Sequence, residues 1–181
     1  MLEHARTPAV LRLVGVPALP IAMAPGILYK ISGGKGGERP PLSARQIASI
    51  PELLDEAAAI YQLPGAMSLI VLSAEWDTKD NPIVVCVRPD VPYGVRRVNA
   101  ITTAFGKDNA AAWAARNRDS LIYVGEKTNP RLPLPGLIYH QTGARETEGS
   151  SRRLLGPDDL RKFKQAVVAA LHMTDNAYRQ R

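Results

Sequence analysis

The chain has 181 residues, of which 45% are hydrophobic and 22% are charged, the composition of an ordinary soluble globular domain with a proper core. Its formal net charge of +6 indicates either a polyanionic partner, nucleic acid or an acidic protein, or simply a basic surface, and charge alone does not choose between them. The single cysteine, Cys86, excludes an internal disulfide and a cysteine-based zinc site, and its apolar neighbours predict a buried core thiol.

The first apolar stretch, Leu13 to Ala24, has the hydrophobicity of a signal peptide. Pro17 and Pro20 would break the apolar region of such a peptide, and Glu3 lies where positive charge is expected. We therefore expect this stretch to belong to the fold. No run approaches the roughly 20 apolar residues of a transmembrane helix, so the sequence predicts no membrane partner.

The segment before the first strands combines short helical signals with proline-rich extended chain. Thr7 and Pro8 predict the start of a short helix, and Ile27–Lys30 a second short helix or turn. The basic, glycine-rich loop Ser32–Pro41 does not match the P-loop spacing, because no Gly-Lys-Ser/Thr sequence opens a helix there. We interpret this loop as a linker.

Two further short helices are predicted at Ser43–Ile50 and Pro51–Ile60. Ser43 and Gln46 have the spacing of a capping box. The role of both helices is expected to be structural.

Strands follow at Met67–Glu75 and Asn81–Arg88, where nearly every position is apolar. A third strand begins at Arg96, a helix carrying Trp113 begins near Asp108, and a last strand spans Ser120–Val124. This order predicts an α+β fold, with a four-stranded antiparallel sheet and helices packed on one face.

After residue 130 the character of the chain changes. We predict one domain over residues 1–130, then a wrapping linker and a C-terminal helix over 131–181. In that helix Leu160, Phe163, Val167 and Leu171 recur at helical spacing, which favours a helix packed back on the domain over a nucleic-acid-binding arm.

The strand that starts at Arg96 carries polar side chains on one predicted face. Alternation places Arg97, Asn99, Ile101 and Thr103 together. The opposite face is small and largely apolar and consists of Val98, Ala100, Thr102 and Ala104. A cation, an amide and a hydroxyl in a row suit a phosphate, although the pattern identifies no reaction.

The segments VNAITTAFGKDN and SLIYVGEK, with TPAVLRLVGVPALPIAMAPGILYK and LSARQIASIPELL upstream, resemble the C-terminal domain of phage MuF-type head-morphogenesis polyproteins. The resemblance extends from Thr7 to Lys127. Families of this kind are grouped with the barnase–EndoU–colicin–RelE-like ribonuclease fold. The resemblance therefore implies a nuclease, but a fold does not by itself establish a function.

A metal-independent ribonuclease needs a base for the ribose 2′-hydroxyl, a donor for the leaving oxygen, and cations for the charge that builds on phosphorus. Under this hypothesis Arg97 clamps the phosphate, Asn99 and Thr103 position it, Tyr123 donates a proton or stacks on a base, and Lys30 supplies a second cation. Each residue also has a structural interpretation. Asn99 fits a buried amide bonded to the backbone, Thr103 an ordinary strand residue, and Tyr123 a rim aromatic.

The general base is the weakest point of this hypothesis, because the family usually has a histidine near the glycine-rich loop and this chain has none there. His4 lies near the N-terminus, and His172 is expected at a helix C-terminus. His140 is the one internal candidate and lies outside the resembling region. No carboxylate pair or His/Asp/Glu cluster suggests a metal site, and no cofactor is predicted.

Two functions follow as hypotheses. The preferred one is a toxin-like ribonuclease that reaches bacterial cytoplasm by phage injection or secretion and cleaves RNA without metal. A toxin of this kind implies an acidic immunity protein as a partner. The alternative is a non-enzymatic phage or effector module that binds RNA or an acidic protein.

Overall fold

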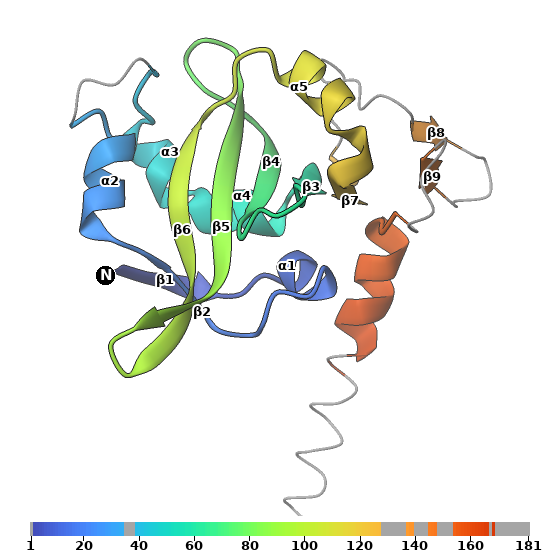
Figure 1. Cartoon of the computed structure of the whole chain (residues 1–181), viewed down its shortest axis with the longest axis horizontal. Coiled ribbons are helices and arrows are strands. Elements are labelled where there is room, and N and C mark those ends of the chain that lie inside the picture. Colours follow the sequence, from blue (N-terminus) through green and yellow to red (C-terminus); the bar gives the residue numbers. More distant parts are fainter. Residues whose placement is uncertain are drawn as a thin grey trace, which may run out of the picture.

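A computed structural model describes residues 2–34, 39–127, 137–139, 145–147, 154–166 and 168. Its centre is a seven-stranded sheet with the order β1-β2-β6-β5-β4-β3-β7 (Figure 1). The strands are β1 (Leu2–Arg6), β2 (Pro20–Met23), β3 (Ala59–Tyr61), β4 (Leu69–Trp76), β5 (Pro82–Tyr93), β6 (Arg96–Gly106) and β7 (Leu121–Val124). Neighbours run antiparallel except β2 and β6, which are parallel. A separate pair joins β8 (Leu137–Tyr139) to β9 (Arg145–Thr147).

The expected α+β class is correct, but the predicted four-stranded antiparallel sheet is wrong. The four predicted strands correspond to β4, β5, β6 and β7, and the structure adds β1, β2 and β3. The three missed strands are short. The proline at the start of β2 indicated only an extended path. Two of the three residues of β3 fall at the end of Pro51–Ile60, which was predicted to be helical. Strands this short carry too few residues to show a period of two.

Helices pack on both faces of the sheet, whereas the sequence predicted only one covered face. One core cluster lies beneath α1 (Ala9–Leu13), α2 (Pro25–Ile31), α3 (Ala44–Ala48) and α4 (Ile50–Asp55). A second, smaller cluster lies against α5 (Ala110–Arg116) and contains Tyr61, Leu72 and Val84. The short 3₁₀ helix η1 (Arg118–Ser120) leads from α5 toward β7. The middle of β5 is thus buried on both faces, which explains its nearly continuous run of apolar residues.

The local signals for helix starts are confirmed where the sequence was specific. The Ser43 hydroxyl accepts a hydrogen bond from the Gln46 amide, and the Gln46 side chain accepts one from the Ser43 amide, so the capping box forms. Residues 157–166 are helical, and Leu160 packs against the larger core cluster. Val167 and Leu171 of the same prediction lie outside the described residues.

A β-bulge in β6 decides which face each of its side chains reaches. Thr103 pairs with Cys86 and Ile101 pairs with Val87, so Thr102 is the extra residue. Asn99 and Ile101 share a face, as predicted, but this face is the one covered by α1–α4, whereas the sequence had indicated it as the polar face that suits a phosphate. Beyond the bulge the alternation is inverted, so Ala104 joins Ile101 in that core and Thr103 turns to the other face.

A second irregularity lies where the long β5–β6 hairpin leaves the sheet. Arg88 pairs with Ala100 and Val91 pairs with Val98, so Pro89 and Asp90 together oppose Asn99. Asp90 has a left-handed backbone with φ of 54°, and its amide donates to Asn99 Oδ1 at 3.0 Å. The Asn99 side-chain amide donates to Thr7 Oγ1 and to the Pro17 carbonyl, both at 2.8 Å. Asn99 therefore joins the N-terminal segment, β6 and the base of the hairpin.

We predict that Asn99→Ala lowers the free energy of unfolding by about 2–4 kcal/mol, because Asn99 is fully buried and its removal leaves buried polar partners unsatisfied. The measurement is the urea unfolding midpoint at an unchanged m-value. Thr103→Val on the same strand is the control and should change stability by about 0.5 kcal/mol or less. Equal destabilisation by the two variants would contradict the bracing role of Asn99.

Candidate functional site: the open face of the sheet

Part of the sheet face that carries α5 is not covered by any helix of the described residues. Figure 1 shows α3 and α4 behind β5 and β6, with α5 to one side. Three cross-strand neighbours, Ile70 on β4, Cys86 on β5 and Thr103 on β6, form a row there, and each is partly exposed. The row toward the hairpin pairs Arg88 with Ala100, and the row toward α5 pairs Val84 with Phe105. We call the partly exposed members of these rows the open face: Ile70, Cys86, Arg88, Ala100, Thr103 and Phe105.

Cations lie along this face and at its border. The Arg39 guanidinium carbon lies 3.7 Å from the centre of the Phe105 ring. Lys107 Nζ lies 5.9 Å from the ring centre of Trp113, the aromatic anchor of α5. Arg88 is exposed, and its Nη2 lies 3.1 Å from Met67 Sδ. None of the six open-face residues is acidic, although Lys107 at the border also lies 3.9 Å from the Asp108 carboxylate. The open face and its border together therefore present cations, one aromatic ring and uncharged side chains.

The sequence predicted that the Cys86 thiol is buried in the core. The structure instead places it in the middle of the open face. It is partly exposed and packs beside the smaller core cluster. Burial raises the pKa of the Cys86 thiol, and the Arg39 charge opposes that rise. The thiol therefore remains protonated at neutral pH and is a poor nucleophile.

Arg97 lies on the hairpin and is bound to Asp90. Its Nε forms an ion pair with the Asp90 carboxylate, and its Nη2 donates to the Asp90 carbonyl at 2.6 Å. The hydrogen bond from Arg97 lowers the pKa of Asp90, so Asp90 stays ionised throughout the neutral range. Since both side chains are about half exposed, this pair orients the base of the hairpin more than it stabilises the fold.

The structure does not bring the five predicted site residues together. Thr103 is on the open face. Asn99 is buried on the opposite face of the sheet, where its side-chain amide donates hydrogen bonds to Thr7 and to the Pro17 carbonyl. Lys30 is exposed on α2. His4 is in β1, while His140 and His172 lie outside the described residues.

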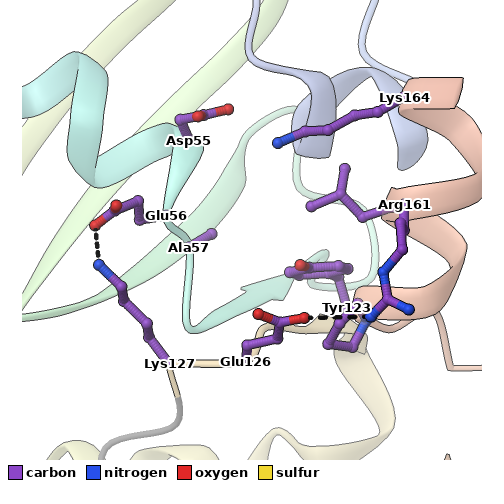
Figure 2. A pocket seen from close by; sticks show the side chains of 10 residues that line it. Asp55, Glu56, Ala57, Tyr123, Glu126, Lys127, Arg161 and Lys164 are labelled. Carbon is purple, nitrogen blue, oxygen red and sulfur yellow. Dashed lines mark hydrogen bonds and ion pairs between the residues drawn. The ribbon is translucent and has the colours of Figure 1, made fainter.

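Tyr123, the fifth predicted residue, points into a separate hollow with a volume of about 350 Å³. Figure 2 shows its ring between the end of α4 and the helix at residues 157–166. Only 3% of Tyr123 is exposed. Leu155 closes this edge of the sheet, because the Val124 amide donates to the Leu155 carbonyl at 3.1 Å.

Paired charges surround the hollow. Lys127 Nζ lies 2.6 Å from Glu56 Oε2, and Arg161 Nη2 lies 3.6 Å from Glu126 Oε1 (Figure 2). Because the positive and negative side chains that line the hollow nearly cancel, its net charge gives no preference for an anion. We therefore take the open face, and not this hollow, as the candidate site.

The described residues contain no group of three or more His, Cys, Asp or Glu side chains placed to hold a metal ion. No helix within the described part of the chain is long and apolar enough to cross a membrane.

A family model for the phage MuF C-terminal domain matches residues 32–130, which is more than half of the chain. The chain belongs to the phage MuF C-terminal domain family. The match covers α3 to β7 and therefore all six open-face residues, but not β1 and β2. No curated protein and no solved structure matches the chain.

Sequence reasoning missed Arg88 and Phe105 of the MuF domain's open face, and Arg39, which lies over the Phe105 ring. Arg39 lies in the loop that was interpreted as a linker, and Phe105 follows a bulge that alternation cannot detect. Arg88 is the first charged residue after the apolar run Pro82–Val87. This change from apolar to charged residues was the sequence feature that could have indicated an exposed position.

Proposed function

We propose that this MuF C-terminal domain binds RNA on the open face of β5 and β6. The observation that carries the proposal is the arrangement of Arg39, Arg88 and Lys107 around a floor of uncharged side chains. In proteins that bind single-stranded nucleic acid, separated Arg and Lys side chains contact phosphates, and the uncharged side chains between them contact bases and sugars. The net charge of +6 adds long-range attraction for a polyanion.

An acidic protein is the other polyanionic partner that the charge allows. The contact between Arg39 and Phe105 favours RNA, since it offers a flat surface on which a base can stack. An acidic protein would use the same cations but has no need of a planar platform.

A second candidate function is metal-independent RNA cleavage, the activity of a toxin-like ribonuclease. It is favoured by the position of the Thr103 hydroxyl, in the row between those of Arg88 and Phe105, where it can contact a ribose or phosphate held by the cations. Cleavage also requires a general base, and the six open-face residues include no histidine or carboxylate. Binding is therefore our first proposal and cleavage the second.

The cleavage candidate retains delivery by a phage or secretion system into bacterial cytoplasm, and an acidic immunity protein as partner. It also retains residues 1–130 as the acting domain and 131–181 as a wrapping linker and C-terminal helix, a segment that lies largely outside the described residues.

Arg88→Ala should weaken RNA binding roughly fivefold, about 1 kcal/mol, and reduce the slope of log K against log salt by about one, as expected for one lost phosphate contact. The measurement is fluorescence anisotropy with a labelled RNA in EDTA at several salt concentrations. Arg45→Ala is the matched control, because Arg45 is an exposed arginine on α3, behind the sheet from the open face. Equal losses in the two variants would contradict a role for the open face.

Cleavage is tested separately by incubating total RNA with excess protein in EDTA across a pH series. The ribonuclease candidate predicts fragments with 2′,3′-cyclic phosphate ends, formed more slowly by Thr103→Val. Intact RNA under all these conditions would eliminate cleavage and leave the binding proposal in place.

A further inference from the structure

We infer that the bound RNA is unpaired and that one base, preferably a purine, stacks on the Arg39 guanidinium, which itself lies on the Phe105 ring. This inference rests on the proposed RNA binding and identifies the form of RNA that the open face accepts. The two residues come from different parts of the chain, the loop before α3 and the strand β6.

The Arg39–Phe105 stack has the geometry of a preformed platform. The guanidinium carbon of Arg39 lies over the Phe105 ring at 3.7 Å from the ring centre, which is van der Waals contact. Phe105 is partly buried against the smaller core cluster, so the lower member of the stack is fixed. Arg39 is exposed, so the outer side of its guanidinium is accessible to a ligand.

The electrostatics of Arg39 also favour a base with a large π surface. Within the described residues Arg39 forms no ion pair with a carboxylate, and its contact is with an aromatic ring. A purine stacked on the outer side extends this contact to a second aromatic system, and a larger ring stacks more strongly. A phosphate would instead approach the edge of the guanidinium, where the N–H groups lie.

The requirement for an unpaired strand follows from the need to reach the face of a base. In a duplex both faces of each internal base are covered by its neighbours, so the platform can act only on an unstacked base.

The base platform and the Arg88 phosphate contact are separate on the open face. Arg88 lies four positions along β5 from Val84, the cross-strand partner of Phe105, which corresponds to about 13 Å at the rise of a strand. Substitutions at the two places should therefore act independently.

The test compares three labelled 12-nucleotide RNAs by anisotropy in EDTA: oligo-rA, oligo-rU and the blunt rA·rU duplex. The wild-type chain should bind oligo-rA about fivefold more tightly than oligo-rU, with the duplex weakest. Arg39→Lys keeps the charge but loses the plane, so it should reduce the rA/rU ratio to about one while the salt slope stays unchanged. Arg88→Ala should weaken both single strands equally and preserve the ratio.

Phe105→Leu should reproduce the effect of Arg39→Lys, and the Arg39 variant carries the test alone if the Phe105 variant unfolds. An rA/rU ratio that is unchanged in Arg39→Lys, or a duplex that binds as tightly as oligo-rA, would overturn the stacking inference while RNA binding stands. If the wild-type chain binds none of the three RNAs, both the inference and the proposed function fail.

Discussion

The hydrogen bonds of one buried amide, Asn99, hold together segments of this molecule that are far apart in sequence. Its side chain contacts Thr7, the Pro17 carbonyl and the Asp90 amide, so it determines how the N-terminal segment meets β6. The parallel pairing of β2 with β6, in which Ile21 lies opposite Asn99, depends on the same contact. This segment lies outside the residues that match the family model, yet it completes the sheet of the family domain.

Much of the fold could be predicted from local signals. The capping box at Ser43 and the four longest apolar or alternating segments each specify an element without help from the rest of the chain. The remaining strands could not be predicted, because β2 and β3 are short and are stabilised by their neighbours rather than by an internal pattern. The register of β6 was correct up to Ile101 and then failed at Thr102, since one extra residue inverts the faces of all later side chains.

The same bulge explains why the predicted site and the observed surface differ. The row Arg97, Asn99 and Thr103 assumed an unbroken strand, but Asn99 faces the core and Thr103 the open face. The residues that accompany Thr103, namely Arg39 and Arg88, come from a loop and from the neighbouring strand. Cross-strand pairing, whose register the bulge sets, brings Arg88 and Thr103 to one surface, and the contact with the Phe105 ring brings Arg39 there. Family membership fixes the domain type, and the chemistry of this surface is the reason why we propose binding ahead of cleavage.

The most direct test of the open face uses its own thiol. Cys86 is the only cysteine in the chain, is partly exposed and lies between the Arg88 and Phe105 rows, so its alkylation reports on this surface alone. Because burial raises the pKa of the thiol, the rate is best measured in mildly alkaline buffer at fixed pH. Saturating single-stranded RNA should slow alkylation severalfold at low salt, and the rate should recover at a salt concentration that abolishes binding. An alkylation rate that is unchanged while RNA is demonstrably bound would contradict the assignment of the open face as the RNA site.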